Sequence, residues 1–331
     1  MSPRLAGLGG KVGSISEEVA AGLGTYNPAL MSPAAHGSFE VGVSRYYAGI
    51  HYDYASYFHH LYPLGMLGIS LRQVWYGRMV RRDAMGNDMG IFTAFDMALG
   101  LHYAHRLGEH WVLGLTLAPI YSQLAQYWAL GLTLDAAVLY QSNNRLFDCS
   151  LLLRNFGGTL KPYAQNHREW APFEVILGCS YTLEHAPLRF IVTLQNLESW
   201  GHRNIPGDSY RGNVAEKNTP QGISWGQKVL HEILVHPIVG VEITPTRYFF
   251  LQVAYNYRRR SDLGLEKLYF VEGLSVGVGI NIGRLKLHYS RAYYHRAGGT
   301  NHFSLTWQFA NPRMQSGPMP YGEQSPRPVV W

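Results

Sequence analysis

A regular alternation of apolar and polar side chains runs through most of this sequence. In LSVGVGINIGRLKLHYS (274–290), valines and isoleucines at the even positions from 276 to 282 alternate with serine, glycine and asparagine. Because successive side chains of a β-strand point to opposite faces, a period of two predicts strands. Gly283 and Arg284 interrupt the pattern for the length of a tight hairpin turn. Each strand is therefore expected to have one apolar face and one polar or small face.

The same pattern recurs about fourteen times along the chain. The expected strands lie near residues 37–45, 47–58, 64–76, 91–106, 110–122, 126–141, 146–156, 171–184, 187–198, 235–245, 247–259, 270–283, 284–294 and 299–309. One set of connections is short, whereas every second connection tends to be longer, as at Gly77–Gly90, Gly157–Trp170 and Ser199–Val235. Outer-membrane barrels have an even number of strands, short periplasmic turns and longer outer loops. The alternation of connection lengths thus favours such a barrel.

The composition points the same way. Charged residues make up only 15% of the 331 residues, against roughly 25% in soluble domains. The mean hydropathy is −0.12 and no apolar run reaches the length of a helical membrane span. The alternative is a soluble β-sandwich or lipocalin-like barrel with its apolar face turned inward. We predict an all-β fold, a transmembrane antiparallel β-barrel of about 14 strands whose aliphatic face meets lipid. Lys and Arg are scattered despite a net charge of +6, so no nucleic-acid partner is expected.

Three segments are expected. Residues 1–36 precede the first strand and are rich in glycine and alanine, and we favour a plug inside the barrel over a periplasmic arm. Residues 37–309 form the barrel, and the Pro-rich residues 310–331 are expected to be a disordered tail. The start of the chain has no apolar core of a secretory signal, which is therefore expected upstream or already removed. Aromatic residues near strand ends are expected to form interfacial girdles: Tyr52, Tyr54, Trp75, Tyr103, Trp111, Tyr121, Trp128, Tyr140, Tyr181, Tyr257, Tyr289 and Trp307.

Charged residues on the predicted inward face have both signs and should pair, because an unpaired buried charge is costly. They are Glu40, Asp53, Arg72, Asp96, Asp135, Arg154, Glu174, Arg189, Glu242 and Lys286. No catalytic motif accompanies them, so no enzymatic activity and no cofactor are expected. The fifteen histidines lack a recognised metal-ligand spacing, so no metal site is expected. Cys149 and Cys179 fall on lipid-facing positions of adjacent predicted strands and are interpreted as inert small hydrophobes.

The outer connections contain the candidate partner-binding residues. The stretch SWGQKVLHEILVH, with Trp225 and His231, has a helical apolar stripe, which suggests an amphipathic helix that docks a partner or serves as a lid. Arg258, Arg259 and Arg260 stand at the outer end of a strand, where they would grip an acidic partner or lipopolysaccharide phosphates, or simply be solvated. His295, at another strand end, completes the set.

Several longer segments resemble the PorQ family of outer-membrane proteins of the type IX secretion system. These are LGGKVGSISEEVAAGLGTYNPALMSP, LLLRNFGG, APFEVILGCSYTLEHAPLRFIVTLQNL, HPIVGVEITPTRYFFLQVAYNYRRR and YHRAGGTNHFSLTWQF. The resemblance runs from about Arg4 to Phe309 and implies a relative of PorV-like barrels within the broad FadL-like group. The element formed by Asn27, Pro28, Ala29 and Leu30 is shared with the wider PorV-like group, and Asn27, Pro28 and Leu30 are assigned to the plug.

The resemblance implies a non-enzymatic role in the outer membrane of a Gram-negative bacterium. Barrels of this family belong to an attachment complex with a PorU-like sortase, a PorV-like barrel and a PorZ-like surface protein, which the barrel holds at the outer face. Outer-membrane lipid and lipopolysaccharide are the other expected partners. The alternative is a FadL-like transporter of hydrophobic small molecules, which follows from the fold alone.

Overall fold

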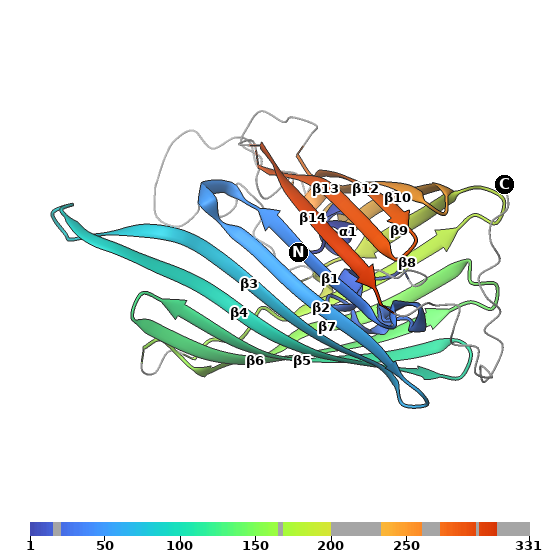
Figure 1. Cartoon of the computed structure of the whole chain (residues 1–331), viewed down its shortest axis with the longest axis horizontal. Coiled ribbons are helices and arrows are strands. Elements are labelled where there is room, and N and C mark those ends of the chain that lie inside the picture. Colours follow the sequence, from blue (N-terminus) through green and yellow to red (C-terminus); the bar gives the residue numbers. More distant parts are fainter. Residues whose placement is uncertain (16–20, 165–167, 200–232, 260–271, 296–297, 310–331) are drawn as a thin grey trace.

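The computed structural model describes residues 1–15, 21–164, 168–199, 233–259, 272–295 and 298–309. Within these residues, fourteen strands form one closed antiparallel barrel (Figure 1). The strands are β1 (Ser38–Arg45), β2 (His51–Leu61), β3 (Gly65–Arg82), β4 (Asp88–Leu107), β5 (Trp111–Leu124), β6 (Tyr127–Gln141), β7 (Phe147–Lys161), β8 (Glu174–Thr182), β9 (Leu188–Leu194), β10 (Pro237–Thr246), β11 (Phe249–Asn256), β12 (Leu274–Ile282), β13 (Leu285–His295) and β14 (Gly298–Gln308).

Each strand pairs with its neighbours in sequence, and the first strand pairs with the last. The β1–β14 ladder runs from Ser38–Gln308 to Arg45–Asn301 and closes the barrel. Closure leaves no open edge around the membrane-spanning ring, so the backbone polar groups there pair between strands. The predicted fold class, with about fourteen strands, is confirmed.

Side chains alternate between the two faces of the wall as the sequence predicts. In β5, Leu113, Leu115 and Leu117 are exposed, whereas Gly114 and Thr116 between them are buried. The exposed leucines form part of a continuous aliphatic outer surface, which a membrane barrel turns toward lipid. Among the described residues, no helix has the length and apolar character needed to cross a membrane.

Two aromatic rows on the outer surface mark the membrane interfaces. Trp75, Phe95, Tyr121 and Trp128, on β3 to β6, follow one another with ring centroids 6.0–6.3 Å apart. Near the other end of the barrel, the ring of Trp111 lies 5.0 Å from that of Tyr140 on β6. Ten residues separate Trp111 from Tyr121 in β5, about 33 Å of strand at ~3.3 Å per residue. At a tilt of about 40° this spans roughly 25 Å, the height of the apolar band of outer-membrane barrels.

The wall is taller on one side than on the other. Strands β3 to β7 have 14 to 20 residues, whereas β8 to β14 and β1 have 7 to 11. Figure 1 shows the β3–β4 hairpin extending far beyond the rest of the barrel. The expectation of a loop over Gly77–Gly90 is therefore wrong for most of its length, because β3 continues to Arg82 and β4 begins at Asp88. The β3–β4 connection itself covers only residues 83–87.

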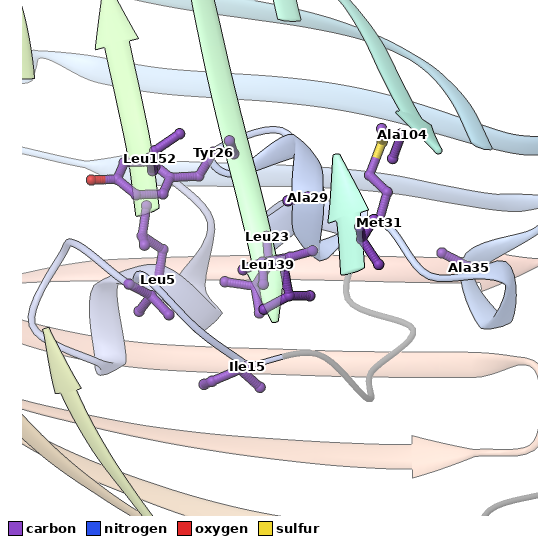
Figure 2. Close-up of a cluster of buried hydrophobic side chains, with 14 of the residues drawn as sticks. Leu5, Ile15, Leu23, Tyr26, Ala29, Met31, Ala35, Ala104, Leu139 and Leu152 are labelled. Carbon is purple, nitrogen blue, oxygen red and sulfur yellow. The ribbon is translucent and has the colours of Figure 1, made fainter. Parts of the chain in front are cut away.

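The segment before β1 lies inside the barrel. Residues 1–15 and 21–36, called here the N-terminal segment, contain the helices α1 (Pro3–Gly7) and α2 (Ala21–Gly24) and the 3-10 turns η1 (Pro28–Leu30) and η2 (Pro33–Ala35). Apolar side chains of the segment form one buried cluster with inward residues of the strands, including Leu139 of β6 and Leu152 of β7 (Figure 2). The hydrophobic core of the molecule therefore lies between the N-terminal segment and the inner wall.

The two cysteines form a disulfide bond, which corrects their interpretation as inert hydrophobes. Cys149 and Cys179 are direct partners in the β7–β8 ladder and are linked to each other. Both lie on the outward face, as expected, but the sequence does not show that the two strands place them opposite one another. Ser150 and Ser180, one residue further along, point inward and are buried.

Two expectations about β2 are wrong for a common reason. Tyr54 was expected in the interfacial girdle, with Tyr52, and Asp53 on the inward face. Tyr54 is instead buried inside, Tyr52 lies on the same inward face opposite the buried Ser44, and Asp53 lies on the outward face opposite Val43. The register with β1 sets these faces, because Gly42 lies opposite Tyr54, and a side chain at Gly42 would overlap the tyrosine ring.

Candidate functional site

The candidate site inside the barrel is the contact between the N-terminal segment and the inner wall. Within the described ranges, no group of three or more His, Cys, Asp or Glu side chains is placed to hold a metal ion. The inward charges instead meet charges or polar groups of the N-terminal segment and of the wall. Two ion-pair networks, one around Arg4 and one around Lys11, account for most of them.

The first network ties α1 to the wall formed by β9, β10 and β11. Arg4 is fully buried, and its Nη1 lies 2.5 Å from Oε2 of Glu242 on β10. The same nitrogen donates to Oε1 of Gln252 on β11 at 2.7 Å, and the guanidinium stacks over the ring of Phe250 at 4.1 Å. Arg189 of β9 approaches the other carboxylate oxygen of Glu242 at 3.4 Å. One carboxylate thus balances an arginine of the N-terminal segment and an arginine of the wall.

The second network lies on the β6–β8 side. Lys11 donates to Oε1 of Glu174 at 2.9 Å and to Oδ1 of Asn196 at 2.8 Å. Arg154 of β7 lies 3.7 Å from Oε2 of Glu174 and 3.9 Å from Oδ2 of Asp135 on β6. Its guanidinium also stacks over the ring of Tyr26 at 4.1 Å. The expected pairing of inward charges is therefore confirmed for Asp135, Arg154, Glu174, Arg189 and Glu242.

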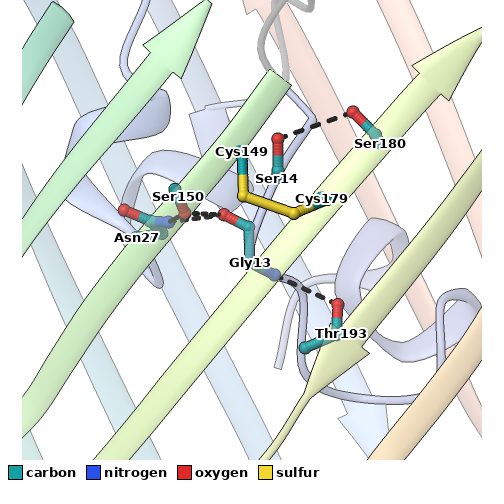
Figure 3. The surroundings of a disulfide bond; sticks show 8 residues. All are labelled: Gly13, Ser14, Asn27, Cys149, Ser150, Cys179, Ser180 and Thr193. Carbon is teal, nitrogen blue, oxygen red and sulfur yellow. Dashed lines mark hydrogen bonds between the residues drawn. A yellow bond between two sulfur atoms is a disulfide. The ribbon is translucent and has the colours of Figure 1, made fainter. Parts of the chain in front are cut away.

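The Asn27–Leu30 element links the N-terminal segment to β7. Asn27 is completely buried, and its Nδ2 donates to the Gly13 carbonyl at 2.8 Å and to Ser150 Oγ on β7 at 3.0 Å (Figure 3). Its Oδ1 accepts from the Ala29 amide at 3.1 Å and so caps the turn that contains Pro28. With its side-chain nitrogen and oxygen both hydrogen-bonded, Asn27 joins two parts of the N-terminal segment to the wall. Pro28 and Leu30 are buried beside it.

Glycines allow the backbone of the N-terminal segment to touch the wall directly. A Cβ atom added at Gly178 of β8 would lie 2.3 Å from the Cα of Gly13, and the reverse holds for Gly13. A Cβ at Gly114 of β5 would lie 2.2 Å from the Ala29 nitrogen. Neither separation is possible for a real side chain, so these positions need glycine while the segment occupies its place. The Gly13 amide also donates a hydrogen bond to Oγ1 of Thr193 on β9 at 3.3 Å (Figure 3).

A third polar cluster holds α2 near β1. Oε2 of Glu40 accepts from the Gly22 amide at 2.9 Å and from Thr306 Oγ1 on β14 at 3.1 Å. The hydroxyl of Tyr54 donates to the other oxygen of the same carboxylate. The fully buried carboxylate of Glu40 is thus satisfied by hydrogen bonds, which is the condition for burying a charge at tolerable cost.

The structure describes three of the six candidate partner-binding residues, and the partner-binding role of all six stays a prediction. Arg259 reaches back to the N-terminal segment, since a Cβ at Gly10 would overlap its guanidinium. Arg258 also ends in a buried nitrogen and is only partly exposed. His295 is the last residue of β13. Trp225, His231 and Arg260 lie outside the described residues, and their role remains a prediction.

The sequence reasoning missed two features. One is the role of Arg4 and Lys11. These two basic residues lie in a Gly- and Ala-rich segment expected inside the barrel, so the carboxylates on the inward face could have been predicted as their partners. The extension of β3 beyond Trp75 lies within the connection expected at Gly77–Gly90. The extension, residues 78–93, is called the arm below.

Comparison with known proteins identifies the fold. A scan against protein-family models finds no match, and a search among curated proteins finds none either. The toluene transporter TbuX of Ralstonia pickettii is similar in structure, with a TM-score of 0.54 and 12% identity over 94% of this chain and 98% of that chain. A FadL homologue of Pseudomonas aeruginosa has a TM-score of 0.50 and 11% identity, again over 94% and 98%. At these identities the likeness concerns the fold.

The chain is therefore a barrel of FadL-like architecture. Its closed sheet, its aliphatic outer surface and its aromatic rows are those of a transmembrane barrel. These features, with the structural likeness, place the chain in the outer membrane of a Gram-negative bacterium, as expected from the sequence.

Proposed function

We propose that this chain is a filled outer-membrane barrel that holds a protein partner at the cell surface. The resemblance to the PorQ family supports a PorZ-like surface protein as that partner, in an attachment complex with a PorU-like sortase and a PorV-like barrel. The observation that carries the proposal is the fixation of the N-terminal segment inside the barrel. Such a barrel offers its outer surface to partners rather than its lumen to a solute.

The fixation is polar as well as apolar. Arg4 and Lys11 of the segment each face a wall carboxylate at 2.5–2.9 Å, and Asn27 bonds to the wall at 3.0 Å. Breaking one buried ion pair by removing a partner costs about 3–5 kcal/mol. A hydrophobic solute that passed through the barrel would have to separate these charges or find a path around them. The energetic argument favours a lumen that stays filled.

Transport of a hydrophobic small molecule is the second candidate. It is supported by the likeness to TbuX, a toluene transporter, over almost the whole of both chains. The N-terminal segment would then have to move or leave a passage beside it. The fold is compatible with both functions, because function depends on sites rather than on architecture.

One experiment separates the two functions in cells. The gene is deleted and restored, and two quantities are measured in parallel: the surface partner released into the medium, and the rate of uptake of radiolabelled toluene. For an anchor, deletion sheds the partner and leaves uptake unchanged, and the partner co-purifies with the detergent-solubilised barrel from restored cells. If deletion slows uptake while the surface protein stays in place, the anchoring function is wrong and transport is adopted.

A further inference from the structure

The arm (residues 78–93) projects beyond the membrane. Trp75 and Phe95 belong to the aromatic row that marks the interface, and the arm begins three residues further along β3. From Trp75 to Arg82 the strand gains seven residues, about 23 Å at ~3.3 Å per residue. Figure 1 shows this hairpin as the most extended part of the described chain. It lies at the end of the barrel with the long connections, which is the outer end.

The arm is preformed rather than adaptable. Its strands pair at Arg78–Thr93, Met79–Phe92 and Val80–Ile91. At the tip, Oδ1 of Asp83 accepts from the amides of Met85 and Asn87 at 2.9 Å. The side chain of Asn87 donates to Oδ2 of Asp83 at 2.9 Å, and this bond together with the backbone bonds holds the pKa of Asp83 below its usual range. A hairpin that is already hydrogen-bonded loses less conformational entropy on binding than an unpaired loop would, which favours recognition.

The β3 side of the arm is an open sheet edge. The β2–β3 ladder ends at the pair His51–Trp75, and the structure, as far as it describes the chain, gives residues 78–82 no partner strand on that side. Unpaired backbone N–H and C=O groups along such an edge can receive a strand from another chain.

The chemistry of this edge is basic with apolar neighbours. Arg78, Arg81 and Arg82 are exposed, and among the described residues no carboxylate pairs with them, although Asp88 lies opposite Arg82. Asp88 instead accepts from the Gly90 amide at 2.9 Å. Apolar side chains are exposed beside the arginines, with Val80 at 48% and Ile91 at 66%. The opposite edge, on β4, carries no basic residue between Asp88 and Thr93.

We propose that the β3 edge of the arm binds an extended acidic segment of the surface partner, which adds to the sheet as a strand. Backbone pairing supplies the strand geometry, and the arginines select carboxylates by charge-assisted hydrogen bonds. Because successive strand residues face opposite sides, Arg78, Val80 and Arg82 share one face of β3 with Ile91. The acidic side chains of the added strand lie on that face, and the apolar ones that alternate with them lie on the other. This inference rests on the proposed anchoring function and names the surface that performs it.

Arginines on a sheet edge also serve a second purpose in proteins, because charged edges prevent edge-to-edge aggregation. A protective edge has no preference for acidic strands in β conformation. The experiment must therefore test charge preference and strand formation separately, on the full chain in lipid nanodiscs.

The probe is a fluorescent octapeptide that alternates glutamate with valine, compared with one that alternates lysine with valine. Binding is measured by anisotropy, and the amide I band of ¹³C-labelled peptide reports whether the bound peptide is a strand. The double variant Arg78→Glu/Arg82→Glu reverses both charges on one face of the edge and should bind the acidic peptide roughly tenfold more weakly or worse, since charge-assisted hydrogen bonds are lost and like charges meet. It should also gain binding of the basic peptide. The matched control, Arg45→Glu/Arg168→Glu, removes two exposed arginines from the same end of the barrel and should bind as wild type.

The proposal is overturned if the control variant loses as much affinity, if both peptides bind wild type equally, or if the bound peptide shows no strand signal. Binding to lipopolysaccharide vesicles is measured in the same way. The proposal is also overturned if the double variant loses affinity only for these vesicles, because the arm would then contact lipid. Co-purification then separates this inference from the anchoring function. If the partner co-purifies with a barrel whose arm has been shortened, binding by the arm is wrong and the anchoring function stands. If the partner never co-purifies with wild type, the anchoring function itself is wrong.

Discussion

Two glycines set the distance between the N-terminal segment and the wall. Gly13 and Gly178 meet backbone to backbone, and a methyl group on Gly178 would lie 2.3 Å from the Cα of Gly13. Gly178→Ala should therefore push the segment away from β8 and admit ions. The matched variant is Gly131→Ala on β6, where the nearest atom to a new Cβ lies 3.5 Å away. Conductance in planar bilayers should rise for Gly178→Ala only, and equal conductance of the two variants would contradict the contact.

The disulfide is the second feature decided by single residues. It closes a loop with a sequence separation of 30 between β7 and β8, which stabilises a fold by roughly 2–4 kcal/mol. Cys149→Ser should lower the urea concentration at the midpoint of unfolding in lipid vesicles. Wild type treated with a reductant that reaches the bond should unfold at the same midpoint as the variant. Identical midpoints for the oxidised protein and for Cys149→Ser would show that the bond does not hold the two strands.

At the scale of elements, strand β6 offers a test of depth in the membrane. Leu130 lies next to the outer aromatic row, opposite Tyr121, whereas Leu134 lies opposite Leu117 near the middle of the band. Both side chains face outward and are exposed to about the same degree, 38% and 40%. Leu134→Arg should cost about 2–4 kcal/mol and Leu130→Arg only about 0–1 kcal/mol, because the penalty falls toward the interfaces. Refolding equilibria in lipid vesicles measure both free-energy costs. A larger cost at Leu130 than at Leu134 would show that the middle of the apolar band lies elsewhere.

At the scale of the whole molecule, the ion pairs hold the N-terminal segment inside the closed barrel. The double variant Glu174→Gln/Glu242→Gln leaves Arg4 and Lys11 without their carboxylates, and breaking a buried pair costs about 3–5 kcal/mol. The segment should become accessible to protease added to vesicles, while the barrel still shifts on gels between unboiled and boiled samples. Asp96→Asn is the control, because Asp96 bonds only to Tyr76 and Ser122 among the described residues. If the double variant is cleaved no faster than Asp96→Asn, the ion pairs do not hold the segment.

The sequence by itself determined how many strands there are, the two faces of most of them and the membrane they cross. These follow from local rules: alternation with a period of two assigns a face to each residue, and connection lengths assign an end to each turn. The outward leucines of β5 and the inward partners of Arg154 were accessible in this way.

Only the tertiary structure decided which residues face each other across strands. The pairing of Cys149 with Cys179, the inward turn of Tyr54 over Gly42 and the continuation of β3 to Arg82 all depend on register between strands. A shift of one residue exchanges the two faces of a strand, so register is fixed by contacts that a single strand does not contain. The contacts of Arg4 and Lys11 have the same origin, because their partners lie more than a hundred residues away along the chain and meet them only when the barrel closes around the N-terminal segment.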